Sequence, residues 1–372
     1  MKISAMLERE DFYSILKKTL IKYSTQLGIS SDKVKILTNK KDCVLYVNPQ
    51  LNAIMAASTN PAVKNFLKTE YNVNGGVFKR MAVKVYLWAA TSFVKFFSQK
   101  GIQLSYDRDM KDLLIYPCNK KIRLFDFGQG IVYTILKDGF PDLYIKREIA
   151  FRQIEANEFV PSIHESGNGY YSERIINGRP LARINDTYFV ETCKRKAYGL
   201  ILSLTKKNEA IETNEYISRL ANECNKLLIQ KCEYTNRDAV CGIFEYLKKE
   251  CLNTKIPIVI SHGDLQPGNI WIDDEHNKLI IIDWETVKQR SIFYDFAALY
   301  LDMRKGISIQ QLYEKILNGS PMLSYEYPTK VIAIIILAEE LVYQTEELAS
   351  FPKGIGTKEY KQIIDQYTHL RL

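Results

Sequence analysis

The stretch SHGDLQPGN (261–269) decides the fold of this chain, because it lies between two short apolar runs, PIVIS (257–261) and LIIID (279–283). Two glycines and a proline in nine residues indicate a loop. The apolar runs on either side predict short buried strands. The intervening residues predict a hairpin, which brings the end of the second run back beside the loop.

Three oxygen-bearing side chains meet in this arrangement: Asp264 and Asn269 from the loop and Asp283 from the strand end. Mg²⁺ prefers hard oxygen ligands, which Asn269 and Asp283 can supply. Asp264 is a separate carboxylate that can orient an attacking hydroxyl and accept its proton. A turn rich in Asp, Asn and Gly without chemistry is the alternative. The full pattern, H-x-D-x-x-x-x-N followed by an apolar strand ending in Asp, favours phosphoryl transfer.

The composition of the 372 residues is that of a folded globular protein, with 46% apolar and 25% charged residues. The net charge of +8 suits anionic small molecules such as nucleotides, or weak attraction to anionic surfaces. No block of five like charges occurs, so we expect no nucleic-acid partner. The seven cysteines form no C-x-x-C pair, and the N-terminus shows no secretory signal. We therefore expect reduced thiols and a cytoplasmic location.

The order of elements predicts an α+β fold with two lobes. Residues 1–110 have mostly helical periodicity. After Asp112, three β-branched and aromatic runs predict an antiparallel meander, and a helix begins near Pro141. Most of the remaining chain is helical. The predicted divisions are a helical N-terminal region of unknown role (1–110), a sheet lobe (111–177) and a helical lobe that carries the loop (178–372).

Residues 77–97 form the most apolar stretch of that length in the first third of the chain. Arg80, Lys84 and Lys95 interrupt it, which argues against a membrane span. We expect a buried helix, because apolar periodicity usually marks a core-facing side. The alternative is a basic amphipathic helix that lies on a membrane surface or on a partner.

The stretches HGDLQPGN, IIIDWE and YDFAALYLDMR resemble the aminoglycoside phosphotransferase / choline kinase family of protein-kinase-like enzymes. The resemblance implies a kinase-like fold that uses ATP and Mg²⁺. By resemblance, Asp264 is the catalytic base, and Asn269 and Asp283 are metal ligands. His262 would hold the loop, and Asp295 would brace it from the following helix.

Two departures from the family pattern leave the catalytic groups in place. Gln266 stands where many members carry His, and Trp284-Glu285 replaces Phe-Gly.

The same resemblance requires a lysine from the sheet lobe, paired with a helix glutamate, to bind the nucleotide phosphates. Lys137 ends a predicted strand and Glu148 lies in the next helix, so this pair is preferred. Lys146 is the competing lysine. By resemblance, the segment from Glu173 through Ile176, which includes Ile175, is the linker between lobes, whose backbone would bind the adenine edge. The alternative for that segment is a plain edge strand.

These features predict an ATP- and Mg²⁺-dependent phosphotransferase that binds its nucleotide between the lobes and phosphorylates a hydroxyl of a small molecule or saccharide. The alternative is a catalytically inactive scaffold with the same fold. A protein kinase is disfavoured, because no Arg precedes Asp264 and no A-P-E sequence follows Asp283.

Overall fold

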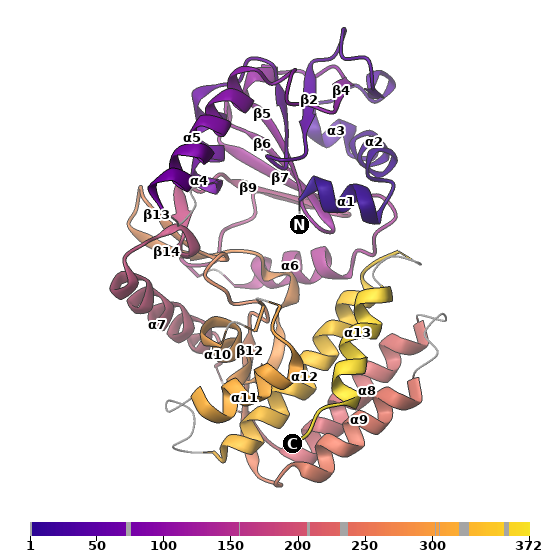
Figure 1. The fold of residues 1–372 in the computed structure, drawn as a ribbon, viewed down its shortest axis with the longest axis vertical. Helices are drawn as coiled ribbons and strands as arrows, with labels where there is room; N and C mark the ends of the chain where they lie inside the picture. Colours follow the sequence, from indigo (N-terminus) through magenta and orange to yellow (C-terminus); the bar gives the residue numbers. More distant parts are fainter. Residues whose placement is uncertain are drawn as a thin grey trace. The chain divides into compact units, whose positions relative to one another are not determined.

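The computed structural model describes residues 2–71, 76–155, 157–206, 209–230, 237–301, 303–304, 306–319, 327–352 and 357–372. They fold into two compact units (Figure 1). Unit 1 comprises Met1–Asp186 and Ile272–Ile280, and unit 2 comprises Thr187–Trp271 and Ile281–Leu372.

Unit 1 is built on a nine-stranded antiparallel sheet with the order β1-β4-β2-β3-β5-β6-β7-β9-β8. Its strands are β1 (Lys35–Leu37), β2 (Leu45–Asn48), β3 (Ala53–Ala56), β4 (Lys100–Gln103), β5 (Leu113–Pro117), β6 (Lys121–Asp126), β7 (Ile131–Leu136), β8 (Glu165–Gly167) and β9 (Tyr170–Arg174). Its helices are α1 (Ile3–Arg9), α2 (Phe12–Lys22), α3 (Ser24–Leu27), α4 (Pro61–Glu70), α5 (Val77–Ser92) and α6 (Leu143–Ile154).

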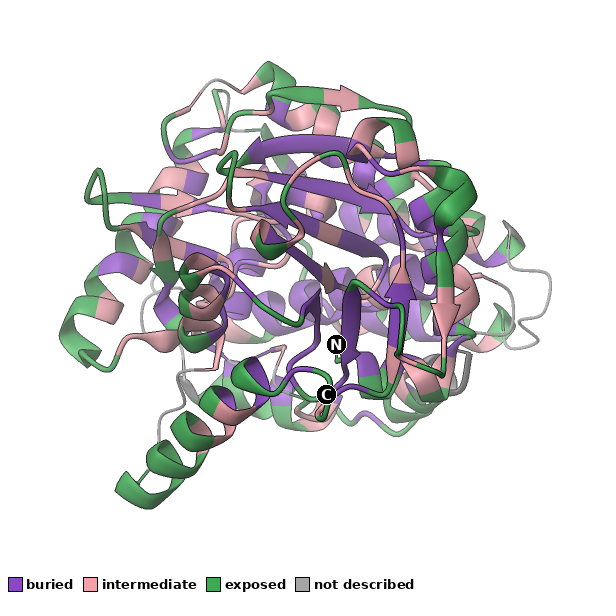
Figure 2. Cartoon of the chain, turned by 90° about the horizontal axis from the view of Figure 1, so that it is seen from above, coloured by how far each residue is buried: buried purple, intermediate pink, exposed green. Residues whose placement is uncertain are grey.

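The predicted meander is confirmed in β5, β6 and β7. Leu114 of β5 pairs with Phe125 of β6, which in turn pairs with Val132 of β7. Successive side chains of a strand point to opposite faces, and here both faces are apolar because both are covered. The strands of this sheet are accordingly mostly buried (Figure 2).

Helices cover the two faces of the sheet separately (Figure 1). On one face, α1, α2 and α3 contribute Ile3, Phe12 and Leu27 to a core that includes Leu124 of β6. On the other face, residues of α4 and α5 form a second core with strand residues such as Phe125. The sheet is therefore the middle layer of three.

The prediction that residues 1–110 form a separate helical region is wrong. This stretch contains strands β1 to β4 as well as helices, and β3 pairs with β5, so it extends the same sheet. The strands are only three or four residues long. Runs this short carry little periodicity, and their pairing partners lie far away in the chain. Local pattern therefore could not reveal them.

The buried helix expected over 77–97 is also wrong. Only Leu87, Ala90 and Thr91 of α5 are buried, while most of its other large apolar side chains are exposed. Periodicity shows which positions are apolar, but tertiary packing decides which of them are covered. Among the described residues, no helix is both long and apolar enough to span a membrane.

Unit 2 is largely helical, with a three-stranded sheet of order β11-β12-β15. Its helices are α7 (Thr187–Ser203), α8 (Thr213–Gln230), α9 (Arg237–Glu250), α10 (Phe293–Tyr300), α11 (Ile309–Gly319), α12 (Thr329–Ala349) and α13 (Thr357–Thr368). The strands are β11 (Glu209–Glu212), β12 (Lys255–Ser261) and β15 (Lys288–Ser291). The core of this unit surrounds α12, whose residues from Val331 to Val342 are all buried.

The predicted boundary at residue 178 is displaced. β10 (Gly178–Pro180) and the chain up to Asp186 belong to unit 1. So does the 272–280 segment of the predicted hairpin, which forms β13 (Ile270–Asp273) and β14 (Lys278–Ile281) in a sheet of order β10-β13-β14. Because β13 pairs with β10, the 272–280 segment belongs to unit 1 although the chain on either side of it belongs to unit 2. The predicted α+β class, a sheet-rich unit followed by a largely helical one, is confirmed.

Candidate active site

The loop 262–269 leaves β12 and is fixed from α10 by one carboxylate. The backbone N–H of His262 donates to Asp295 Oδ2 at 2.7 Å, and that of Gly263 donates to Asp295 Oδ1 at 2.9 Å. Gly263 has φ +83°, and a Cβ there would lie 2.7 Å from the Thr286 carbonyl oxygen. Only glycine fits this turn without strain. The predicted bracing role of Asp295 is confirmed.

His262 is a structural residue, as predicted. Its Nδ1 accepts the Asp264 backbone N–H at 3.3 Å, so its Nε2 carries the proton donated to the Ile282 carbonyl, at 2.9 Å. The ring is fully buried and meets the Trp284 indole edge-on, with centroids 4.7 Å apart. His262 therefore ties the loop to the strand end that precedes Asp283.

Asp264 is held by three side chains. Gln266 Nε2 donates to its Oδ2 at 3.1 Å, and Asn269 Nδ2 donates to the same oxygen at 3.2 Å. Arg304 Nε donates to Oδ1 at 3.2 Å. The carboxylate is thus oriented on both oxygens, while the side chain retains 19% of its exposure. A carboxylate fixed in this way can receive a proton from a hydroxyl group placed beside it.

Burial raises the pKa of Asp264 to about 6, with a smaller contribution in the same direction from the negative charge of Asp283. The positive charge of Arg304 opposes the rise. At neutral pH the group is therefore ionised but more basic than an ordinary aspartate, and such tuning suits a general base.

Arg304 is a residue that the sequence analysis missed, although it ends the quoted stretch YDFAALYLDMR. Its Nη1 donates to both carboxylate oxygens of Glu340 on α12, at 2.6 and 2.7 Å, and its Nη2 donates to Tyr294 at 2.8 Å. The guanidinium also stacks on the Tyr343 ring, 3.7 Å from its centroid. Arg304 therefore links Asp264 to the buried helix α12 and restrains its carboxylate. Arg304 lies 40 residues beyond Asp264 in the chain, so no local sequence pattern indicates that the two side chains meet.

The structure places Asp283 next to the loop, as the sequence predicted. The backbone N–H of Ile282 donates to the Asn269 carbonyl at 2.9 Å. Asp283 itself has a left-handed backbone, φ 68° and ψ 54°, which is uncommon outside glycine and often found at functional sites. The following 3₁₀ turn, Trp284–Thr286, is anchored by the buried indole, which donates to the Ile281 carbonyl at 2.7 Å.

Asn269 and Asp283 fit a divalent cation by their chemistry. The amide nitrogen of Asn269 donates to the backbone and side-chain oxygens of Asp264, at 2.9 and 3.2 Å. Its other terminal atom, the carbonyl oxygen Oδ1, is thereby turned away from Asp264. Together with the Asp283 carboxylate it gives the hard oxygen donors that Mg²⁺ requires.

The predicted pairing of Lys137 with Glu148 is wrong. Lys137 is completely buried, and its Nζ donates to Glu10 Oε1 at 2.7 Å and to the Asn119 carbonyl at 3.0 Å. Glu10 follows α1, more than a hundred residues away in the chain. Lys137 is therefore a structural residue that fastens the N-terminal helix to the sheet. The competing Lys146 is exposed and pairs with Asp142 at 2.6 Å.

Glu148 of α6 instead accepts a hydrogen bond from Lys121 Nζ at 3.1 Å. Lys121 begins β6, and only 5% of its side chain is exposed. Arg152, one turn further along α6, approaches the other carboxylate oxygen of Glu148 at 3.4 Å. Unit 1 thus contains a strand lysine paired with a helix glutamate, but the lysine comes from the strand next to the predicted one. Lys121 pairs with Leu136 across the sheet, so a single register step separates it from Lys137.

The predicted adenine-binding segment lies at the end of β9. The Glu173 side chain is bound by the Arg152 guanidinium, and the Ile175 backbone N–H donates to the Gly130 carbonyl at 2.9 Å. β9 is not an edge strand, because it pairs with β7 and β8. Adenine recognition here stays a prediction, and it would have to use groups other than the Ile175 N–H.

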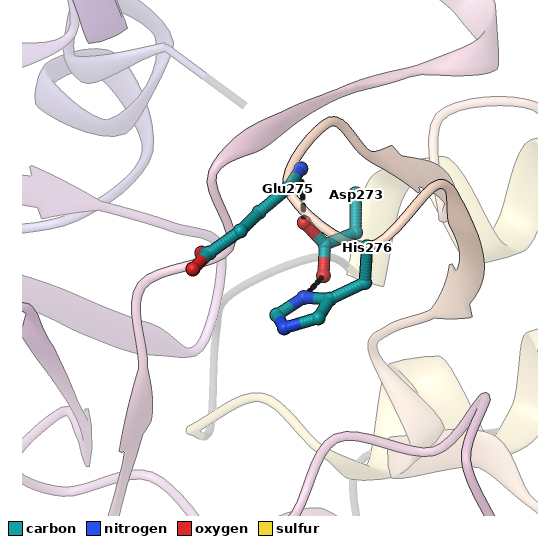
Figure 3. Close-up of side chains that lie close together, drawn as sticks. All are labelled: Asp273, Glu275 and His276. Atoms are coloured by element: carbon teal, nitrogen blue, oxygen red, sulfur yellow. Dashed lines mark hydrogen bonds and ion pairs between the residues drawn. The ribbon is translucent and has the colours of Figure 1, made fainter.

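A second acidic cluster lies on the β13–β14 turn and consists of Asp273, Glu275 and His276 (Figure 3). Asp273 accepts the Glu275 backbone N–H at 2.9 Å and contacts His276 Nδ1 at 2.7 Å (Figure 3). These bonds close the turn, and both Glu275 and His276 are exposed. The closeness of these three side chains is therefore explained by the geometry of the turn, without a metal ion.

A family model described as Choline/ethanolamine kinase matches residues 191–318. This segment of the chain matches the choline/ethanolamine kinase family. The matched range includes the loop 262–269, Asp283, Asp295 and Arg304. The resemblance predicted from the sequence is confirmed for this segment.

The other comparisons point to similar proteins. Probable choline kinase 3 of Arabidopsis thaliana is 40% identical over 57 residues, which are 15% of this chain and only 16% of that protein. The choline kinase LicA from Streptococcus pneumoniae is 15% identical, with a TM-score of 0.39 over 70% of this chain and 90% of that one. A choline kinase from Cryptosporidium parvum is 14% identical, with a TM-score of 0.41 over 71% and 89%. A thermostable mutant of an aminoglycoside phosphotransferase is 15% identical, with a TM-score of 0.45 over 69% and 93%.

Proposed function

We propose that the protein is an ATP- and Mg²⁺-dependent phosphotransferase that phosphorylates a hydroxyl group of a small molecule or saccharide. The observation that carries the proposal is the Asp264 carboxylate, which Asn269, Gln266 and Arg304 hold in one orientation beside the Asp283 strand end. The match of this segment to the choline/ethanolamine kinase family supports the proposal.

Asp264 would orient the acceptor hydroxyl and take its proton as the bond to phosphorus forms. Phosphoryl transfer demands mainly positioning and charge neutralisation, so a rigid base is more useful than a mobile one. Although its pKa is raised to about 6, Asp264 is still ionised at neutral pH, and the rise brings its pKa closer to the operating pH of a general base.

Asn269, through its amide oxygen, and Asp283, through its carboxylate, would hold Mg²⁺. When bound, Mg²⁺ supplies positive charge to the phosphate oxygens of the nucleotide. The left-handed backbone of Asp283 and the hydrogen bond from Ile282 to Asn269 fix the two ligands relative to each other.

Lys121 would bind the nucleotide phosphates, the role that the sequence analysis gave to Lys137. Two observations support this assignment. Lys121 pairs with Glu148 on α6, as a kinase phosphate lysine pairs with its helix glutamate. Lys137 is engaged by Glu10 and has no exposed surface.

The acceptor would be an amino alcohol such as choline or ethanolamine, because the family model that matches residues 191–318 is described as Choline/ethanolamine kinase. Aminoglycosides and amino sugars are the next class to test. The acceptor would contact the helices of unit 2, which follow or precede the loop in the chain.

The test is phosphoryl transfer by the purified 372-residue chain with labelled ATP, Mg²⁺ and a panel of choline, ethanolamine, aminoglycosides and amino sugars. We expect turnover of at least one acceptor. Asp264→Asn should reduce kcat by about 10³-fold, within the usual range for loss of an acid–base residue, while ATP and Mg²⁺ still raise the melting temperature.

Asp238→Asn is the matched control, because Asp238 is an exposed carboxylate on α9 of the same unit. It should leave kcat unchanged. Turnover by Asp264→Asn at the wild-type rate would contradict the role of Asp264. The absence of turnover with every acceptor, together with no thermal shift from any nucleotide, would favour the inactive scaffold.

A further inference from the structure

The outward side of α5 carries a stripe of large apolar residues: Phe78, Met81, Val85 and Trp88. Their side chains are 90%, 58%, 61% and 63% exposed. The spacings of three, four and three residues place them on one side of the helix. Phe93 and Phe96, just beyond the end of α5, are also exposed.

The opposite side of α5 fastens the helix to unit 1. Leu87 and Ala90 are buried in the core that includes Phe125 of β6, together with Val94. The apolar stripe is therefore not the core-facing side of this helix. Contiguous exposed apolar surface of this kind usually marks an interaction site.

A cavity of about 710 Å³ lies beside the stripe, between α4, α5 and the chain that follows β10. It is lined by six cationic side chains, from Lys64, Lys68, Arg80, Lys84, Arg179 and Arg183. No Asp or Glu is among the described residues that line it. Glu70, at the end of α4, acts electrostatically on Arg183, and Arg179 lies 3.9 Å from the Asp274 carboxylate, so carboxylates offset at most two of the six charges. The cavity therefore suits an anionic group.

Trp88 belongs to both features, since it lines the cavity and lies on the stripe. An occupant of this face must offer negative charge to the cavity and apolar material to the stripe at the same time. Free phosphate offers the first but not the second, and nucleic acid offers only base faces, which stack on aromatic rings rather than cover aliphatic side chains such as Val85. A bilayer that contains anionic phospholipids offers both, and indole side chains prefer the level of the headgroups.

We propose that the α4–α5 face of unit 1 binds the surface of membranes that contain anionic phospholipids. A headgroup phosphate occupies the basic cavity, and Phe78, Met81 and Val85 enter the boundary between headgroups and acyl chains. Amphipathic helices bind membranes by this combination of apolar burial and electrostatic attraction. The inference is independent of the phosphotransferase activity, because it uses none of the residues assigned to that activity.

The experiment is vesicle flotation of the 372-residue chain. We expect binding to vesicles of phosphatidylcholine with 30% phosphatidylserine, and at least tenfold weaker binding to phosphatidylcholine alone. Binding to the anionic vesicles should weaken at least tenfold at high salt, because screening shortens the reach of the cavity charges. The variants Lys68→Glu/Lys84→Glu and Phe78→Ser/Met81→Ser should each weaken it at least tenfold.

Two matched controls distinguish the effect of this face from the effect of net charge or of any exposed aromatic side chain. Lys17→Glu/Lys18→Glu changes the net charge equally on α2, where both lysines are exposed. Tyr188→Ser removes an aromatic side chain that is 81% exposed on α7. Both should bind within twofold of wild type. Circular dichroism and melting temperature check that every variant is folded.

Two results would overturn the proposal. One is the absence of binding to the anionic vesicles. The other is binding that the face variants and the control variants weaken equally. If wild type fails to bind vesicles but self-associates in light scattering, and Phe78→Ser/Met81→Ser abolishes the association, the face is an interface between copies of this chain.

Discussion

Two buried lysine–glutamate pairs in unit 1 look alike but join different elements. Lys137 pairs with Glu10 at 2.7 Å, and Lys121 pairs with Glu148 at 3.1 Å. The first pair joins the end of β7 to the segment after α1 and is shut off from solvent. The second joins β6 to α6, and its glutamate is also approached by Arg152.

The comparison shows that chemistry and burial alone do not identify a functional lysine. Its position at the end of a predicted strand favoured Lys137. In the structure, however, Lys137 pairs with Glu10, which directly follows the N-terminal helix α1. Lys121 keeps the helix glutamate that the kinase arrangement requires. The partners of each lysine, rather than the lysine itself, support the proposal that Lys121 binds the nucleotide phosphates.

The largest effect is expected on stability, from Glu10→Ala. The substitution leaves Lys137 buried without its carboxylate, and burial already lowers the pKa of Lys137 while Glu10 opposes that change. Breaking a buried pair on one side typically costs about 3–5 kcal/mol of unfolding free energy. Urea unfolding measures this loss.

The double variant Glu10→Leu/Lys137→Met should recover much of that stability, because apolar replacement of a buried ion pair is often neutral. Activity per folded molecule should stay near wild type in both variants. A Glu10→Ala protein as stable as wild type would show that the pair does not fasten the N-terminal helix.

The next largest effect is expected on catalysis, from Lys121→Met. Loss of a charged contact to the nucleotide phosphates should lower kcat/KM about 100-fold, equivalent to about 2.7 kcal/mol. Stability should fall less than in Glu10→Ala, because Arg152 still faces Glu148. Steady-state kinetics at saturating and limiting ATP measures the change.

Lys146→Met is the control for Lys121→Met, since Lys146 is an exposed lysine on α6 that pairs only with Asp142 in the described chain. It should leave kcat/KM unchanged. If Lys121→Met retains full activity while Lys137→Met, once corrected for its folded fraction, loses it, the two pairs have been assigned the wrong way round.

The smallest effect is expected in the pH dependence of kcat/KM. This measurement tests Asp264 on the unit 2 loop and involves neither lysine pair of unit 1. Asp264 acts as a base only when it is ionised. Since its pKa is raised to about 6, kcat/KM should rise with pH up to about 6 and level off above it. Arg304→Lys keeps a positive charge but loses the Nε hydrogen bond that holds it beside Asp264. The opposition to the pKa rise should weaken, so the acid limb should move to higher pH, by less than one unit.

Arg219→Lys, an exposed change on α8, should leave the acid limb in place. An acid limb near pH 4 in the wild type would contradict the assignment of the limb to a buried Asp264.

Much of unit 2's site could be predicted because its groups are local in the chain. Asp264, Asn269 and Asp283 lie within twenty residues of one another, and the loop and strand signals around them place them together. The bracing by Asp295 was implied by the resemblance of the stretch YDFAALYLDMR to the kinase family. Arg304 could not be predicted, because its partners Glu340 and Tyr343 lie about forty residues further along the chain on α12.

In unit 1 the sequence predicted the β5–β7 meander and α6 but missed β1 to β4. Those strands pair with partners that only the folded sheet brings together, such as β3 with β5. The same limit explains the buried helix wrongly expected at α5, since apolar periodicity does not reveal which side a neighbouring layer covers.

The sequence by itself determined the chemistry of the loop 262–269, the carboxylate at the end of the following strand and the alternation of elements that makes an α+β fold. Only the tertiary structure decided which lysine meets Glu148, where unit 1 ends and which side of α5 faces outward. The reason is physical: turn and strand preferences act over a few residues, whereas ion pairs and sheet order depend on chain segments that meet only after folding.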